Sequence, residues 1–145
     1  MAVLERLLKE SGYSITRPRK VVCELLWNQE PLSMHDLSIR SQDRIDRASL
    51  YRTISLFEKL GLVQRIYIGW KYKIELSDVL THHHHHLSCL ACGKVIAITE
   101  EDEIERLIAA IAERHGFAPQ KHQLEVSGYC ADCSGKPRIK KSTLV

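Results

Sequence analysis

Residues 46–76 read DRASLYRTISLFEKLGLVQRIYIGWKYKIEL, and two successive patterns in this stretch decide the fold of the first half. Over residues 46–60, apolar side chains recur at helical spacing, and Gly61 stands where a helix can end. The period then changes to two, which predicts a hairpin with strands over 63–68 and 70–76. A helix followed by such a hairpin is typical of a winged helix-turn-helix.

The residues before this stretch predict further helices. Residues 2–11 are amphipathic, Thr16 is a suitable N-cap for a second helix, and Ser33 is suitable for a third. In the hairpin's second strand, alternation predicts one face made by Trp70, Tyr72, Ile74 and Leu76, and an opposite face made by Lys71, Lys73 and Glu75.

The outward face of the predicted helix over 46–60 is basic and suits nucleic acid. Tyr51 and Arg52 are expected to contact DNA bases, because arginine can bind guanine edges through two hydrogen bonds. Arg47 and Lys59 are expected to lie against phosphates. A basic helix face that is merely solvated is the alternative, and the wing that follows favours DNA.

The charges of the two halves differ. The whole chain of 145 residues has 21 Lys and Arg against 18 Asp and Glu. Residues 1–80 hold 13 basic and 10 acidic side chains, whereas residues 81–135 hold four basic and eight acidic ones. The first half therefore suits an anionic partner and the second suits cations.

Two Cys-x-x-Cys pairs, Cys89/Cys92 and Cys130/Cys133, predict a tetrahedral zinc site. Each short turn presents two thiolates from one side, and the site would clip the end of the chain onto an earlier strand. Four free thiols are the alternative. Cys23 lies on the apolar stretch of the second helix and is expected in the core.

Residues 82–86 are five consecutive histidines, and their internal position argues against an engineered tag. In a strand, alternate side chains point to opposite faces, so one strand can serve two metal sites. His82, His84 and His86 would face one way with Glu75 as a candidate partner; His83 and His85 would face the other way with Glu105 and His122. Imidazole with carboxylate suits zinc, iron or manganese. A surface run that only scavenges metal is the alternative.

These patterns predict an α+β chain: a winged-helix DNA-binding domain (1–76), a hinge (77–81), a small α/β metal-binding dimerisation domain with the four-cysteine zinc site (82–135), and a basic tail (136–145). Within the second domain, a helix is predicted around residues 104–111 and strands over 95–98 and 122–128. No apolar run is long enough to span a membrane, and the polar N-terminus favours a cytoplasmic protein.

At the level of motifs, HHHHHLSCLACGKVI (82–96) resembles the signature of the ferric uptake regulator superfamily. RASLYR (47–52) resembles its recognition helix, and TRPR (16–19) resembles the start of its second helix; Ser49 and Arg19 in these motifs complete the candidate DNA contacts. The resemblance implies a homodimeric, metal-activated transcription regulator, most often a repressor, that binds palindromic operator DNA. It assigns structural zinc to Cys89, Cys92, Cys130 and Cys133, a regulatory metal to Glu75, His84 and His86, and a second metal to His83, His85, Glu105 and His122.

The chain departs from the family pattern at several positions. Pro31 stands where an N-terminal histidine commonly completes the regulatory site, and Glu30 or His35 is a possible substitute. Ala97 and Ser14 replace an acidic ligand and a lysine. The zinc-responsive branch usually has Cys where Glu75 lies and Asp where Gln64 lies, so an iron-responsive member is expected, with zinc-responsive and manganese- or peroxide-responsive members as alternatives.

Two other classes of protein are weighed against a regulator. A zinc deaminase needs a His-x-Glu motif, which the histidine run lacks, and a four-cysteine site leaves no open zinc position. A metal buffer would have no use for a winged helix. A protein without catalytic activity, without an organic substrate and without a membrane partner is therefore expected.

Overall fold

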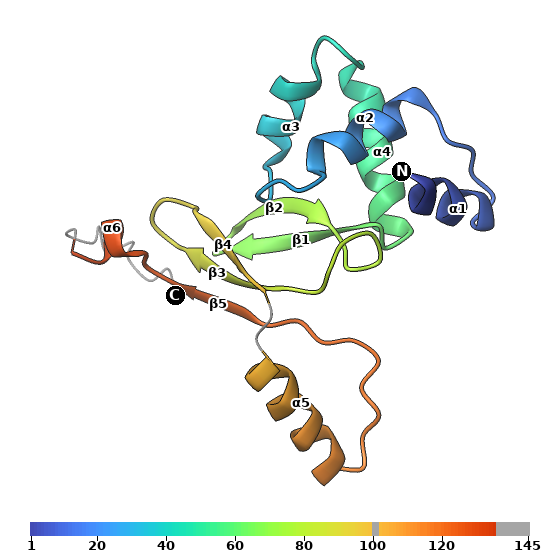
Figure 1. Ribbon diagram of the computed structural model, residues 1–145. Coiled ribbons are helices and arrows are strands. Elements are labelled where there is room, and N and C mark those ends of the chain that lie inside the picture. Colours follow the sequence, from blue (N-terminus) through green and yellow to red (C-terminus); the bar gives the residue numbers. More distant parts are fainter. Residues whose placement is uncertain (100–101, 136–145) are drawn as a thin grey trace, which may run out of the picture.

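The computed structural model describes residues 1–99 and 102–135 and arranges them in two parts (Figure 1). The basic tail and the acidic residues 100–101 lie outside the described residues. The first part consists of α1 (Ala2–Glu10), α2 (Arg17–Leu26), α3 (Met34–Ser41), α4 (Arg47–Lys59), β1 (Val63–Ile68) and β2 (Lys71–Leu76). The second consists of β3 (His85–Cys89), β4 (Val95–Ile98), α5 (Asp102–Arg114), β5 (Glu125–Gly128) and α6 (Ala131–Ser134).

Local capping explains where α3 and α4 begin and where α4 ends. The Asp36 N–H donates to Ser33 Oγ and the Ser33 N–H donates to Asp36 Oδ2, both at 3.1 Å, which closes a capping box. Asp46 caps α4 by accepting the Ser49 N–H at 2.9 Å. Gly61, with φ of +66°, ends α4 in a conformation that suits glycine. Thr16 stands at the N-cap of α2, but its side chain makes no capping bond.

The main core lies between the helices and the wing. Leu50, Ile54 and Phe57 form the inward stripe of α4, and each is at most 4% exposed. Their neighbours come from α1, α2 and the wing, and Cys23 is among them, as predicted. A bridge between Leu32 and Ile74 attaches the segment before α3 to the wing.

The wing is an antiparallel pair with a register from Val63 opposite Leu76 to Ile68 opposite Lys71. Its second strand starts at Lys71, so the prediction that Trp70 belongs to the strand face was wrong. Trp70 lies in the turn after Gly69 and is 79% exposed. The turn has Gly69 at φ of +62°, which rotates the chain out of strand geometry before Trp70.

The second part is built on a sheet of order β4-β3-β5. β3 and β4 are antiparallel, whereas β3 and β5 are parallel. Two predicted strands are shorter than expected: β3 begins at His85 and β5 at Glu125, because the preceding residues have no partner strand in the described sheet. β4 coincides with the predicted 95–98.

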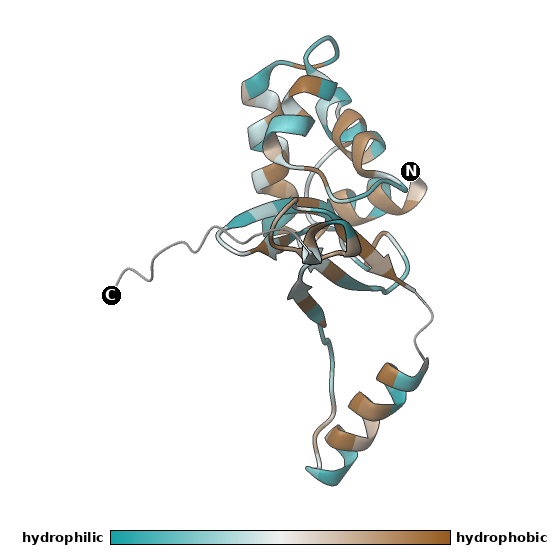
Figure 2. Ribbon diagram, turned by 90° about the vertical axis from the view of Figure 1, so that its left-hand side faces the viewer, coloured by the Kyte–Doolittle hydropathy of each residue, from teal (hydrophilic) through white to brown (hydrophobic). Residues whose placement is uncertain are grey.

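A small second cluster joins the two parts. Ile66 and Ile68 of β1 and Val95 of β4 are buried together, apart from the main core. The wing therefore has the helices on one face and the second sheet on the other, as Figure 1 shows. α5 projects away from the sheet, with an apolar stripe visible in Figure 2; Leu107 and Ile111 are 59% and 42% exposed.

Candidate metal centres and nucleic-acid interface

The four cysteines converge at one end of the second sheet. Cys89 ends β3 and Cys130 follows β5, so the parallel pairing carries both knuckles to the same edge. All four Sγ atoms lie within 4.8 Å of one another, with 3.8 Å between Cys92 and Cys130. Tetrahedral zinc with bonds of about 2.3 Å places sulfurs about 3.8 Å apart, so this cluster fits a structural zinc site.

The thiols of this cluster differ in acidity. The Cys130 N–H donates to Cys89 Sγ at 3.4 Å, and this bond with others from the knuckle lowers the pKa of Cys89 to about 6. Hydrogen bonding to Cys130 and burial raise the pKa of Cys133 to about 12. Cys89 therefore forms a thiolate more readily than Cys133, and metal binding by all four would release protons.

The first histidine cluster joins the wing to the second part. Glu75 Oε2, on β2, lies 3.3 Å from His84 Nε2 and 3.0 Å from His86 Nε2. Glu75 and His86 are 5% and 2% exposed, and Gln64 Nε2 donates to the other carboxylate oxygen at 2.7 Å. One oxygen of Glu75 thus faces two imidazole nitrogens while the other is held by the neighbouring strand.

Electrostatics favour the charged forms of Glu75 and His84. Burial by itself would raise the pKa of Glu75, but hydrogen bonds from His86 and Gln64 hold it below its usual value. For His84, burial acts to lower the pKa, yet the His82 carbonyl and Glu75 raise it overall. A divalent cation would replace the imidazole protons as the partner of this buried carboxylate.

The second cluster lies on the opposite side of the histidine run. Glu105 Oε1, on α5, is 3.1 Å from both His85 Nε2 and His122 Nε2, and 3.4 Å from His83 Nε2. The Nε2 atoms of His83 and His122 are 2.9 Å apart. Ligands of a tetrahedral metal with bonds of about 2.0–2.1 Å are separated by about 3.3 Å, close to these values. Burial alone would raise the pKa of Glu105, but His122 and its neighbours lower it.

The histidines alternate between the two clusters as a strand would place them, although only His85 and His86 lie within β3. The structure brings together every residue that the family resemblance assigns to each metal group. His82 belongs to neither group, nor do Glu30 and His35, the suggested substitutes at the regulatory site. Pro31 is buried and Ala97 is exposed. Sequence reasoning missed Asp78, whose carboxylate contacts His83, because a lone acidic residue in a short link gives no spacing signal.

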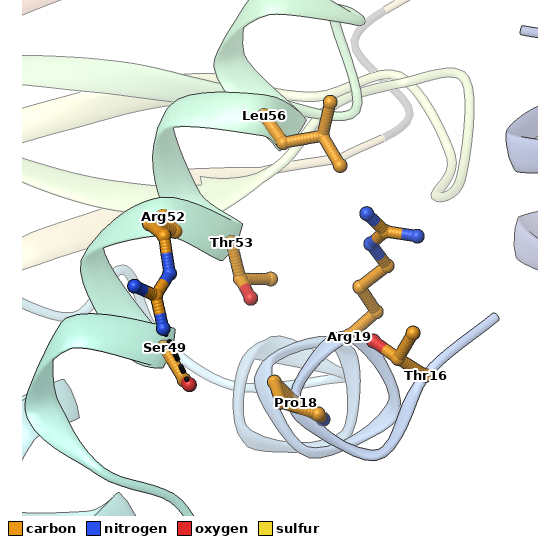
Figure 3. A pocket seen from close by; sticks show the side chains of 7 residues that line it. All are labelled: Thr16, Pro18, Arg19, Ser49, Arg52, Thr53 and Leu56. Carbon is orange, nitrogen blue, oxygen red and sulfur yellow. Dashed lines mark hydrogen bonds between the residues drawn. The ribbon is translucent and has the colours of Figure 1, made fainter. Parts of the chain in front are cut away.

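The predicted DNA contacts gather mainly at the start of α4. Ser49 Oγ donates to Asp46 Oδ2 at 2.6 Å. It accepts from Arg52 Nη2 at 3.2 Å, the bond drawn in Figure 3. The Arg47 guanidinium lies 5.5 Å from the centre of the Tyr51 ring, which is 43% exposed. These side chains form one polar and aromatic face, on which Arg47, Tyr51 and Arg52 are exposed and Ser49 is half-buried.

Arg19 faces this group across a groove of about 200 Å³ between α2 and α4. It donates to the Ser14 carbonyl and stacks on Tyr13, 5.3 Å from the ring centre. Figure 3 shows Arg19 and Arg52 on opposite sides of the groove. Lys59 is exposed in the last turn of α4, about 18 Å along the helix from Arg47, so the structure does not bring it to this group.

Comparison with known proteins identifies the family. The model of the ferric uptake regulator family matches residues 10–127, most of the chain. This chain belongs to the ferric uptake regulator family. The ferric uptake regulation protein of Escherichia coli K12 is 39% identical over 133 residues, which cover 86% of each chain.

Solved structures of the family share the fold. The Vibrio cholerae ferric uptake regulator matches with a TM-score of 0.70 and 31% identity, over 87% of this chain and 98% of that one. The Helicobacter pylori regulator, described as having three functional metal binding sites, matches with a TM-score of 0.74 and 25% identity, over 94% of this chain and 95% of that one. The family resemblance and the α+β fold predicted from the sequence are confirmed. In the described residues no helix is long and apolar enough to cross a membrane.

Proposed function

We propose that this chain, a metal-responsive DNA-binding regulator, senses ferrous iron at the cluster of Glu75, His84 and His86. The observation that carries the proposal is that Glu75 belongs to the wing while the two histidines belong to the second part. A cation held there would tie the orientation of the DNA-binding domain to metal supply. Zinc or manganese remains the alternative, because the same donors suit both.

The proposed switch is a change in population. We take residues 1–76 as the DNA-binding domain, 77–81 as the hinge and 82–135 as the dimerisation domain. Without metal, the wing would sample many angles; the donors of both domains converge only in the docked arrangement, so a cation favours that state. A dimer so fixed can place two recognition helices about 34–36 Å apart on a palindromic operator.

The partner proposed for the second domain is another copy of this chain. Leu87, Ile96 and Val126 expose 39–48% of their surface on the sheet, and α5 adds Leu107 and Ile111. Family membership supports a dimeric DNA-binding protein, and these side chains offer the apolar surface that a homodimer needs. We propose that operator binding represses transcription. The proposed location is the cytoplasm, because the partner is DNA.

A regulator is favoured over an enzyme or a metal buffer. In the cysteine cluster all four coordination positions are supplied by protein, so a substrate would have no open position. A buffer gains nothing from the exposed face at the start of α4. Structural zinc at the four cysteines and a second metal at the other histidine cluster would complete the metal content.

The test compares His86→Ala with His115→Ala, since His115 is exposed and belongs to neither histidine cluster. Duplexes selected from a random library by the parent protein are used in anaerobic titrations with Fe(II), Mn(II) and Zn(II). Both variants should fold, but only His86→Ala should lose metal-dependent DNA affinity. Normal binding by His86→Ala at limiting metal would refute the sensing site. Failure of the parent protein to select any duplex, with or without metal, would favour a buffer.

A further inference from the structure

Asp78, in the link between the wing and the second sheet, contacts the second histidine cluster. Its Oδ2 lies 2.7 Å from His83 Nδ1. The other nitrogen of the same ring, Nε2, lies 2.9 Å from His122 Nε2 and 3.4 Å from Glu105 Oε1. The His83 ring therefore stands between the link on one side and the candidate metal ligands on the other.

This arrangement favours the tautomer with its proton on Nδ1, because a carboxylate accepts a hydrogen bond and cannot donate one. With Nδ1–H donating to the carboxylate, Nε2 presents its lone pair to the cluster, as a metal ligand must. Histidine ligands commonly donate their second ring N–H to a carboxylate, which orients the ring and increases its basicity. The residues fit a metal by their donor chemistry as well, since three imidazoles and one carboxylate converge there.

Asp78 is also tied to the DNA-binding domain through its neighbour. The Ser77 N–H donates to the Leu62 carbonyl at 3.0 Å, and Ser77 Oγ donates to the Gly61 carbonyl at 2.5 Å. Gly61 and Leu62 connect α4 to β1, so Asp78 is one residue away from an anchor on the DNA-binding domain.

The surroundings of the other Asp78 oxygen, Oδ1, show why the hydrogen bond with His83 matters to this carboxylate. Oδ1 is buried and, among the described residues, has no hydrogen-bond partner. The Asp78 side chain as a whole is 28% exposed, but a carboxylate with one buried oxygen and few partners still gains from a strong donor. A cation at Nε2 withdraws electron density from the imidazole and makes Nδ1–H such a donor.

We propose that Asp78 is a positioning residue for the second metal site and couples its occupancy to the link between the domains. The coupling is reciprocal: metal at the second cluster favours the ordered link, and the ordered link raises metal affinity. The inference rests on the proposed function in one respect, that the orientation of the two domains governs DNA binding.

The experiment measures Co(II) binding in a His86→Ala background, in which the first cluster is disabled and the cysteines keep their zinc. Asp78→Ala is compared with Asp78→Asn and with Asp43→Ala, an exposed aspartate outside the clusters. Competition with a chromophoric chelator gives the affinity, and the visible absorption bands of Co(II) report its coordination. Asp78→Ala should bind Co(II) about 10–100-fold more weakly, as expected for loss of a residue that orients a ligand. Asp78→Asn should be intermediate, because its amide oxygen accepts the bond without the charge.

Hydrogen exchange of the amides in residues 77–83 provides the second readout. Saturating Co(II) should slow exchange in the background protein and in Asp43→Ala, but not in Asp78→Ala. Equal affinity or equal protection in Asp78→Ala would overturn the proposal. No DNA is present, so these results are separable from a failure of the proposed function, which is judged by DNA binding.

Discussion

Replacing Ile66 by alanine should weaken the docking of the wing on the second sheet. Ile66 is fully buried, and among the described residues its buried cluster consists of Ile66 itself, Ile68 of the same strand and Val95 of β4. The side chain therefore contributes to contact between the wing and the second sheet, in contrast to Ile54, which is 4% exposed inside the main core.

The size of the effect follows from the carbons removed. Alanine lacks the three outer carbons of isoleucine, and at about 0.8 kcal/mol each their burial is worth about 2.4 kcal/mol. A residual cavity can raise the cost to about 4 kcal/mol. Since a factor of ten corresponds to about 1.4 kcal/mol, the docking equilibrium should fall by about 50-fold or more. Metal affinity at Glu75, His84 and His86 should fall by up to the same factor, because those donors converge only when the domains are docked.

The assay is an anaerobic Fe(II) titration against a chromophoric chelator, combined with urea unfolding. Ile54→Ala is the matched control: it should lower the unfolding free energy by about 2–5 kcal/mol and leave metal affinity unchanged. Val95→Ala should act like Ile66→Ala, and the double variant should show less than the sum because both remove one contact. If Ile66→Ala and Ile54→Ala gave the same metal affinity, the inferred role of this cluster in docking would be wrong.

Three shorter predictions concern other parts of the chain. Cys133→Ser should release zinc and abolish cooperative unfolding of the second domain, as followed by a zinc indicator and circular dichroism; retained zinc would count against the four-cysteine site. Arg52→Ala should cost about 1–3 kcal/mol in DNA affinity and relax base preference at one position. Lys59→Ala should change affinity little, because Lys59 lies away from the group at the start of α4. Fluorescence anisotropy on duplexes with single base substitutions measures both, and equal losses in the two variants would refute the assignment. Ser33→Ala should lower the unfolding free energy by about 1 kcal/mol near neutral pH. The hydrogen bond from Ser33 lowers the pKa of Asp36, so this stabilisation exists above the usual aspartate pKa and is lost as pH falls through the folded value; a pH-independent difference in urea titrations would contradict it.

Signals that are local in sequence predicted much of the fold. Ser33, Asp46 and Gly61 mark helix ends through bonds that span three or four residues, and the structure has helix ends there. The alternation of the histidine run likewise depends only on neighbouring residues. The division of His83 to His86 between two groups could therefore be predicted without knowing where Glu75, Glu105 and His122 lie.

Contacts between residues distant in sequence could be predicted at the metal groups, where the donor residue types mark them, but not elsewhere. The parallel pairing of β3 with β5 joins segments on either side of α5, and no pattern in either strand specifies it. The burial of Ile66 against Val95 is a contact between the wing and the second sheet, so the sequence of the wing by itself predicts only that Ile66 is apolar. Asp78 is recognisable only once the link has folded beside His83.

The parallel pairing of β3 and β5 also has a consequence for how a newly synthesised chain matures. A ribosome must complete α5 before β5 exists, so the first cysteine pair cannot complete the zinc site until the second pair is made. Cys92 and Cys130, one from each pair, are 38 residues apart. Closing a loop of that length costs about 4 kcal/mol in chain entropy, by the relation used for covalent cross-links. Zinc supply should therefore set the time at which the second domain is finished, while the winged helix, whose contacts lie earlier in the chain, can fold during synthesis.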